Sequence, residues 1–299
     1  MRSDCFHSAF WTAVLRCSFG IFVGLFSILP GGATAAADIR HFQICSNRGP
    51  DRLYAFGDSY SDIGAGYVDG NGPTAVYYFA THLGLMLRYP GERASPTDSL
   101  DFAVSGAQSG SSEGQRVKSN TLGRGLLTQV GDLRAALADG TAKLGSCNLA
   151  FIAIGLNDRQ LPTSETQANI ELAVGRLHNM GIRLFQIALL PRATPSFASV
   201  SRRLNPAIRS VVSEARARFL DSDIRVSNWG YFYDTVKRDG ARYGITNVDT
   251  PCAAGRALFG QSENPCRHPE HYYFFHDGHP STAVHRIVGE MLWREWLSR

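Results

Sequence analysis

The sequence has no block of like charges, no internal repeat and no low-complexity linker. Its 30 basic and 26 acidic residues give a net charge of +4 spread along 299 residues, so the charge pattern does not favour a nucleic-acid partner. Charged residues make up 19% of the chain and hydrophobic residues 44%. This balance excludes a disordered chain and favours a folded globular protein.

Two common zinc-binding patterns are also missing. The chain has no Cys-x-x-Cys pair and no two histidines at the helical i, i+4 spacing. Five of its nine histidines do fall between residues 268 and 285, so a metal site built from this tract with Glu270 and Asp277 is an alternative. The missing ligand spacing argues against that site, and we expect neither a metal nor an organic cofactor.

Long apolar runs are scarce, and the run at residues 18–29 is too short to span a bilayer comfortably. Arg2 and Arg16 precede this run, while a Pro-Gly-Gly break and small residues follow it. The order basic, apolar, small is typical of a signal peptide. We therefore predict a signal peptide at residues 1–37 and a single secreted or periplasmic domain at 38–299, with an uncleaved membrane anchor as the alternative.

Cysteine is rare as well, with six in the chain, two of which fall in the predicted signal peptide. The other four are Cys45, Cys147, Cys252 and Cys266. An even number of cysteines in an oxidising compartment is most simply explained by two disulfides.

What the chain does contain is an alternation of apolar runs and helical patterns. Strands are expected at residues 53–56, 100–104, 149–154, 182–190 and 224–226, and helices at 75–85, 126–138, 165–180, 206–220, 229–238 and 281–297. The segment 252–271 is expected to be a loop. Strand–helix alternation of this kind predicts an α/β fold whose parallel sheet is covered on both faces.

Three predicted strands end in residues that could perform acyl transfer. Gly57-Asp58-Ser59 follows the first strand, Ser105-Gly106 the second and Asn157 the third, and the carboxyl ends of parallel strands form the edge where ligands bind. Acyl transfer needs a nucleophile, a base and donors for the oxyanion. The Ser59 hydroxyl could be the nucleophile, and the Ser59 and Gly106 N–H groups and the Asn157 amide could be the donors. Taken singly, Ser59 and Asn157 are better explained as turn residues.

The missing base would be a histidine that folding brings to the same edge. His279 precedes Pro280 and the predicted closing helix, which Ser281 could cap, so its loop is well placed to reach over the strand ends. By contrast, His178 and His285 fall within predicted helices and are expected on helix surfaces.

In four blocks the chain resembles the SGNH, or GDSL-type, hydrolase family. The blocks are FGDSYSDIG (56–64), FAVSGAQSG (102–110), IGLND (154–158) and DGHPSTAVH (277–285), and they occur in the family's order. The resemblance implies a flavodoxin-like, three-layer α/β/α sandwich with a five-stranded parallel sheet. It also implies that Ser59 is the nucleophile, that Ser59, Gly106 and Asn157 form the oxyanion hole, and that His279 is the base.

One departure from the family pattern concerns the residue that orients the base. Family members usually carry Asp three residues before the histidine, and here His276 occupies that place while Asp277 lies two residues before His279. We expect the Asp277 carboxylate to accept the His279 Nδ1 proton, because His276 would bring no negative charge. The alternative is that a main-chain carbonyl or a bound anion orients the base.

The same resemblance suggests disulfide pairs and a substrate. Cys252 and Cys266 bracket the loop before the catalytic histidine, and Cys45 and Cys147 precede the first and third strands, which are neighbours in this fold; we expect these two pairs. The long GDSYSDIG block is similar to that of secreted lipases, phospholipases and haemolysins, which implies an acyl-enzyme on Ser59, lipid or phospholipid esters as substrates and transient contact with a membrane surface. A polysaccharide O-deacetylase, an acyltransferase and a binding protein with an impaired site are the alternatives.

Overall fold

The computed structural model of the chain describes residues 45, 49–64, 69–92, 95–117, 120–253 and 265–298. The predicted signal peptide at residues 1–37 lies outside these ranges, as does most of the loop between Cys252 and Cys266. Within them, no helix combines the length and the apolar character that crossing a membrane requires.

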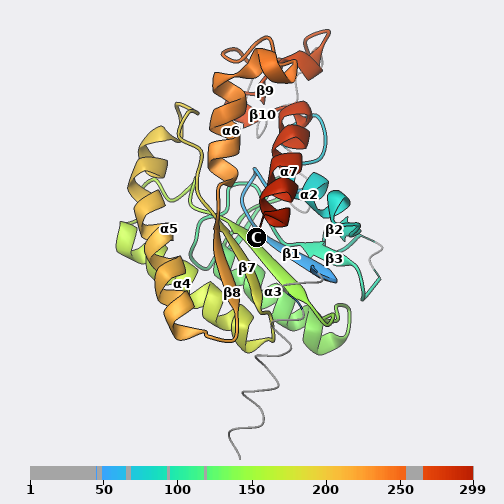
Figure 1. Cartoon of the computed structure of the whole chain (residues 1–299), viewed down its shortest axis with the longest axis vertical. Coiled ribbons are helices and arrows are strands. Elements are labelled where there is room, and N and C mark those ends of the chain that lie inside the picture. Colours follow the sequence, from blue (N-terminus) through green and yellow to red (C-terminus); the bar gives the residue numbers. More distant parts are fainter. Residues whose placement is uncertain are drawn as a thin grey trace, which may run out of the picture.

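Six parallel strands form the central sheet in the order β2-β3-β1-β6-β7-β8 (Figure 1). They are β1 (Arg52–Gly57), β2 (Leu87–Arg88), β3 (Ser99–Asp101), β6 (Asn148–Ala153), β7 (Leu184–Ala188) and β8 (Asp223–Ser227). The predicted parallel α/β sheet is confirmed, but the expected number of five strands is one too few. The additional strand, β2, is two residues long, and so short a strand leaves no hydrophobic pattern to detect.

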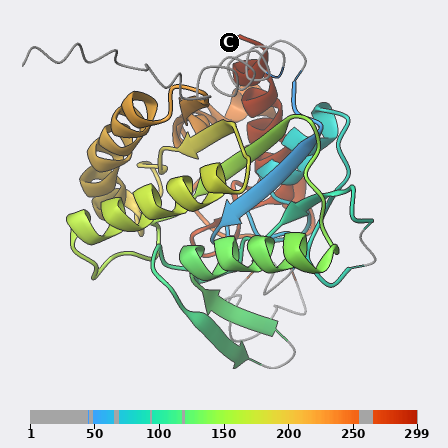
Figure 2. The same ribbon diagram turned by 90° about the horizontal axis from the view of Figure 1, so that it is seen from below.

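Helices cover both faces of the sheet, which confirms the predicted three layers. Figure 2 shows α3 and α4 on one side of the sheet and α2 and α7 on the other. In addition, α5 packs against α4, and α6 packs against α7. The helices are α2 (Ala75–His82), α3 (Leu126–Asp139), α4 (Thr163–Asn179), α5 (Ala198–Arg218), α6 (Trp229–Arg238) and α7 (Thr282–Leu297). Because both faces are covered, β6 and β7 are buried along their whole length, which explains their largely apolar sequences.

The helix predicted to begin at Pro206 begins earlier, at Ala198. Proline is favoured in the first turn of a helix because it lacks an N–H, and this preference led to the wrong start. In the structure Pro206 lies inside α5, next to the buried Asn205. The Asn205 amide accepts from the Leu190 N–H at 2.8 Å and donates to the Leu190 carbonyl at 3.0 Å. These contacts with the segment just after β7 help to offset the hydrogen bond that proline removes from the helix.

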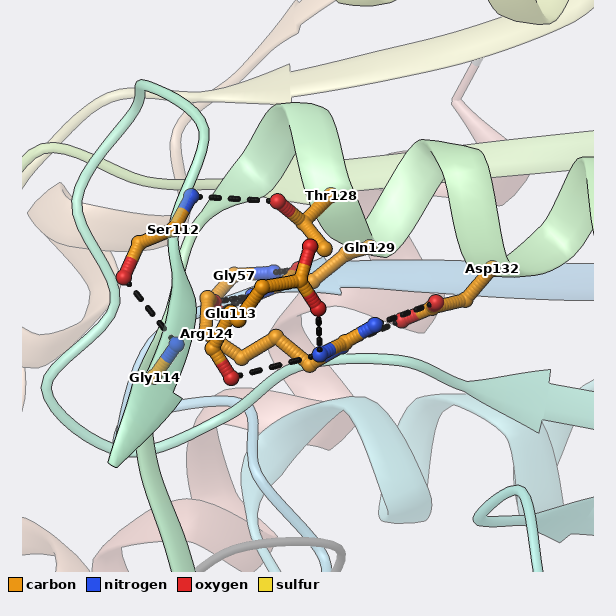
Figure 3. A network of polar contacts seen from close by, with 8 residues as sticks. All are labelled: Gly57, Ser112, Glu113, Gly114, Arg124, Thr128, Gln129 and Asp132. Carbon is orange, nitrogen blue, oxygen red and sulfur yellow. Dashed lines mark hydrogen bonds and ion pairs between the residues drawn. The ribbon is translucent and has the colours of Figure 1, made fainter. Parts of the chain in front are cut away.

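A hairpin that the sequence did not predict projects from the body of the domain (Figure 2). Its strands, β4 (Glu113–Val117) and β5 (Asn120–Arg124), are short and largely polar, so they carry no buried-strand signal. The Gly123 N–H donates to the Ser105 carbonyl at 2.8 Å. Arg124 pairs with Asp132 of α3 at 2.6 Å and with Glu113 at 2.7 Å (Figure 3). The hairpin is therefore fixed between the loop after β3 and helix α3.

Two disulfides join the four cysteines that follow the predicted signal peptide. Cys45 is bonded to Cys147, 102 residues later, and Cys252 to Cys266, 14 residues later. The Cys252 N–H also donates to the Phe274 carbonyl at 3.0 Å. Phe274 begins β9 (Phe274–His276), which pairs with β10 (His279–Pro280), so the second disulfide lies against the hairpin that carries His279.

Candidate active site

The turn after β1 presents Ser59 at the carboxyl edge of the sheet. Gly57 ends the strand, and a Cβ there would lie 2.4 Å from the Ala153 carbonyl oxygen, so only glycine fits. The Gln129 side chain of α3 holds Gly57 from both sides: Oε1 accepts from its N–H at 3.0 Å and Nε2 donates to its carbonyl at 2.8 Å (Figure 3). The Asp58 carbonyl then accepts from two later N–H groups and closes a tight turn around Ser59.

His279 meets Ser59 directly, although 220 residues separate them in the chain. The His279 Nε2 atom lies 2.8 Å from the Ser59 Oγ atom. Tyr60, the residue after the serine, donates its buried hydroxyl to the Gly278 carbonyl at 2.7 Å and so ties the nucleophile turn to the histidine hairpin. Ser281 caps α7 by accepting the Val284 N–H, as the sequence predicts.

The His279 imidazole is set up to accept a proton. Burial lowers its pKa to about 4, an effect that the neighbouring Asp277 opposes. At neutral pH the ring is therefore uncharged. If Nδ1 carries the proton and donates it to the Asp277 carbonyl, Nε2 keeps a lone pair that faces the Ser59 hydroxyl.

The predicted contact between the Asp277 carboxylate and His279 Nδ1 is not what the structure contains. The nearest acceptor of Nδ1 is the main-chain carbonyl of Asp277, at 3.3 Å, and the Asp277 side chain is exposed. Gly278 has a φ of +75° and folds the two-residue link so that the carbonyl faces the ring. His276 is buried opposite His279 in the hairpin. Of the alternatives drawn from the sequence, the main-chain carbonyl fits this geometry.

The two loops expected to supply oxyanion donors are bonded to each other. Gly106 is exposed with a φ of +81°. The Asn157 side-chain amide donates one hydrogen to the Ala107 carbonyl at 2.9 Å, which leaves its second hydrogen available. The nucleophile turn joins this group because Asp62 Oδ2 accepts the Ser105 N–H at 2.8 Å. One chain of contacts therefore links all the strand ends that the sequence singled out.

Three other residues of the site were not recognised in the sequence. Gln129 holds the nucleophile turn, and Tyr60 ties that turn to the histidine hairpin. A buried glutamine among the apolar positions of α3 is the one sequence signal that could have identified Gln129. The third is Asp69, whose Oδ2 atom lies 3.5 Å from His279 Nε2. Burial raises the pKa of Asp69 to about 7. No spacing rule points to a carboxylate ten residues after the nucleophile.

The expectation that His285 lies on a helix surface is wrong. His285 is buried, because α7 packs against both α2 and α6. Its Nδ1 atom lies 2.7 Å from the Tyr233 hydroxyl and 3.2 Å from the Ala75 N–H. Burial lowers the pKa of His285 to about 3, so the ring is neutral and fills the space beneath the site.

The alternative metal site also takes a different form from the one considered in the sequence. Among the described residues, His268, Glu270 and His271 bring their ligand atoms within 4.8 Å of one another. All three are exposed, and Asp277 is not among them. Exposed side chains at such distances occur commonly without a metal, and this group shares no residue with the Ser59–His279 pair.

A serine hydroxyl bonded to a neutral imidazole at the carboxyl edge of a parallel sheet is the arrangement that serine hydrolases use. Residues 55–287 match the model of the GDSL-like Lipase/Acylhydrolase family. The chain belongs to this family, which confirms the resemblance seen in its four sequence blocks and makes it an ester hydrolase by class. A search of curated proteins found no match.

Several solved structures are similar to this chain at low sequence identity. The psychrotrophic esterase EstA from Pseudoalteromonas sp. is 12% identical, with a TM-score of 0.44 over 83% of this chain and 100% of EstA. The acetylxylan esterase Axe2 from Geobacillus stearothermophilus is 14% identical, with a TM-score of 0.43 over 82% of this chain and 94% of Axe2. A G-D-S-L lipolytic family member from Veillonella parvula is 13% identical, with a TM-score of 0.43 over 80% and 94%. At such scores these likenesses carry no inference about substrate.

Proposed function

We propose that the chain hydrolyses carboxylic esters through an acyl-enzyme on Ser59. The observation that carries the proposal is the 2.8 Å contact between Ser59 Oγ and His279 Nε2. Ser59 Oγ attacks the ester carbonyl carbon as its proton moves to Nε2, and the N–H groups of Ser59 and Gly106 with the Asn157 amide hold the oxyanion. Nε2 then protonates the leaving alcohol. A water molecule, deprotonated by the same nitrogen, releases the acid and restores the serine.

Lipid or phospholipid acyl esters are the substrates that we favour. A cavity of about 380 Å³ is lined by Ile63, Tyr77, Leu87 and Tyr89, together with the ion pair of Arg88 and Glu92, and Ile63 follows the nucleophile turn. The apolar and aromatic part of this lining suits an acyl chain. Met86, also in the lining, is 57% exposed, which supports transient contact with a lipid surface. Two disulfides are compatible with the secretion that the signal peptide predicts.

The hydrolysis itself is tested with 4-nitrophenyl esters and the protein purified after expression of the full chain. Ser59→Ala should lower kcat/KM by on the order of 10³-fold or more, because it removes the nucleophile. Ser61→Ala is the matched control, since it makes the same change two residues away in the same turn and should keep most of the activity. Equal activity of Ser59→Ala and the unaltered protein would refute the proposal.

The acyl preference is tested with acetate, butanoate and octanoate esters. A lipid enzyme should prefer octanoate, and Ile63→Trp, which fills the cavity, should lower octanoate hydrolysis while largely sparing acetate. The acetate rate thus serves as an internal check that the variant is folded. Exclusive turnover of acetate by the unaltered protein would instead favour a deacetylase, and the appearance of a transferred ester in the presence of an alcohol would favour an acyltransferase.

A further inference from the structure

The nitrogen of His279 that receives the serine proton also faces a carboxylate. Its Nε2 atom lies 2.8 Å from Ser59 Oγ and 3.5 Å from Asp69 Oδ2. The Asp69 side chain is 3% exposed and the His279 side chain 22%. A charge on Asp69 would therefore act on the ring with little screening by water.

The carboxylate on the side of the other ring nitrogen, Asp277, is exposed to water, and its effect on the pKa of His279 is smaller than that of burial. The acceptor at Nδ1 is the Asp277 main-chain carbonyl, at 3.3 Å, while the Asp277 carboxylate is exposed to water. A carbonyl can fix the tautomer of the ring, but it carries only a partial charge. A second carboxylate that is shielded from water would therefore add to the stabilisation of the imidazolium that forms during attack.

The loop that carries Asp69 is held to both halves of the site. The Asn71 side chain accepts the Thr282 N–H at 2.8 Å, just beyond the histidine hairpin. Thr74 donates its hydroxyl at 2.9 Å to the carbonyl of Ser61, in the nucleophile turn. Asp69 is therefore fixed in place by contacts that also fix Ser59 and His279.

The surroundings of Asp69 are not those of a purely structural carboxylate. Ser105 donates a hydrogen bond to it, but its buried Oδ1 atom has no hydrogen-bond partner within the part of the chain that the structure describes. A buried carboxylate that only supports the fold usually has its oxygens satisfied. Burial makes the charge of Asp69 unfavourable in the resting enzyme, so a nearby positive charge would be stabilising when it forms.

We propose that Asp69 is a positioning residue that acts through His279 and supplies the negative charge that stabilises its imidazolium. This inference rests on the proposed function. When Ser59 Oγ forms its bond to the ester carbon, its proton moves to Nε2, and the resulting N–H⁺ lies between the serine oxygen and Asp69. Asp69 keeps its charge and takes no proton, and Nε2 passes the proton to the leaving alcohol.

The test compares kinetics of Asp69→Asn with those of the unaltered protein, using a 4-nitrophenyl ester. An opposite charge within about 4–6 Å shifts a pKa by about 1–3 units, so its removal should lower kcat by about 10- to 1,000-fold with little change in KM. Asp223→Asn is the matched control, because Asp223 is nearly as buried but lies at the opposite, amino end of β8. It should leave kcat and KM unchanged. Thermal unfolding of each variant checks that the fold is intact.

The pH profile of kcat/KM supplies a readout that a structural role would not affect. The groups facing His279 are Asp69, Asp277, Tyr60 and the neutral His285. In the unaltered protein the rate should fall as the pH drops through about 7, where the Asp69–His279 pair takes up a proton. In Asp69→Asn the fall should move towards pH 4, where His279 alone would be protonated.

A second buried carboxyl, that of Asp58, also has its pKa raised to about 7. The pH profile of kcat/KM is therefore measured for Asp58→Asn as well. An acid limb that moves in Asp58→Asn and not in Asp69→Asn would overturn the inference, as would a kcat of Asp69→Asn within about threefold of normal. If Asp69→Asn does not fold, the pH profile of the unaltered protein still tests the inference. An acid limb of kcat/KM near pH 4 instead of pH 7 would leave Asp69 without a role. Loss of activity in Ser59→Ala with normal Asp69→Asn refutes this inference alone, whereas an active Ser59→Ala refutes the dyad and the inference together.

Discussion

The difference in stability between Asp58→Asn and the unaltered protein should depend on pH, and it should favour the variant more at pH 8 than at pH 5. Asp58 is fully buried in the nucleophile turn and accepts the Tyr60 N–H at 3.2 Å. Burial raises its pKa from 3.8 to about 7, an effect that the nearby Asp158 and Asp69 charges increase. The folded state therefore binds this proton more tightly than the unfolded state does.

The sign and size of the effect follow from that difference in pKa. Stability conferred by the proton is present below about pH 4 and is lost as pH rises towards 7, because the unfolded chain gives up the proton first. A shift of about 3 units corresponds to about 4 kcal/mol at pH 8, of which about 1.5 kcal/mol is already lost at pH 5. Asparagine does not ionise, so the stability of Asp58→Asn relative to the unaltered protein should improve by about 2.5 kcal/mol between pH 5 and pH 8.

Urea unfolding at pH 5 and pH 8, followed by tryptophan fluorescence, measures both free energies of unfolding. The new amide NH₂ could leave an unsatisfied contact that costs about 1–3 kcal/mol, but that cost is the same at both pH values and cancels in the comparison. Asp139→Asn is a control without a pH effect in this range: Thr141 lowers the pKa of this exposed carboxyl, so it is ionised in the folded and unfolded chains at both pH 5 and pH 8. An Asp58→Asn effect that is identical at pH 5 and pH 8 would refute the reasoning.

Three further changes are expected to have distinct effects. Replacing both Cys45 and Cys147 by serine should lower the free energy of unfolding by about 4–5 kcal/mol, since the bond closes a loop of 102 residues, and an unchanged urea midpoint would contradict this. Gly57→Ala should cost about 2–4 kcal/mol by forcing a Cβ against a neighbouring carbonyl, and a normal melting temperature would argue against that clash. Tyr60→Phe should cost about 1–3 kcal/mol by leaving the Gly278 carbonyl unpaired, and should lower kcat more than it raises KM; unchanged kcat would show that the hydroxyl does not position the base.

The parts of the fold that could be predicted are those with a strong local pattern. The buried runs that became β1, β6 and β7 are apolar on both faces, and the predicted helices 229–238 and 281–297 agree with α6 and α7 to within a residue. The β4–β5 hairpin could not be predicted because polar, exposed strands lack a period-2 hydrophobic signal. The start of α5 was missed because contacts between helix and strand outweigh the local preference of proline.

The residues of the candidate site also divide into those that the sequence indicates and those that only the structure reveals. Ser59, Gly106, Asn157 and His279 lie next to strand ends or helix starts, and their place in the chain therefore indicates a role. The position of Asp69 beside His279 depends on how a loop folds across two elements, which no local pattern reports. The carboxylate of Asp277 was expected at Nδ1 because its spacing allowed it, whereas the backbone at Gly278 turns its carbonyl there instead.

The distance in sequence between nucleophile and base has a consequence for biosynthesis. Ser59 and His279 are 220 residues apart, so at about 5–20 residues per second a ribosome makes the base about 10–45 s after the nucleophile. His279 can hold its place only once α7 has packed against α2, and the loop with Asn71 needs Thr282 from that same helix start. If Ser59 and His279 are the nucleophile and base that we propose, a growing chain with a folded first half should have no ester-cleaving activity. We expect hydrolysis to begin only when Thr282–Leu297 has emerged and docked.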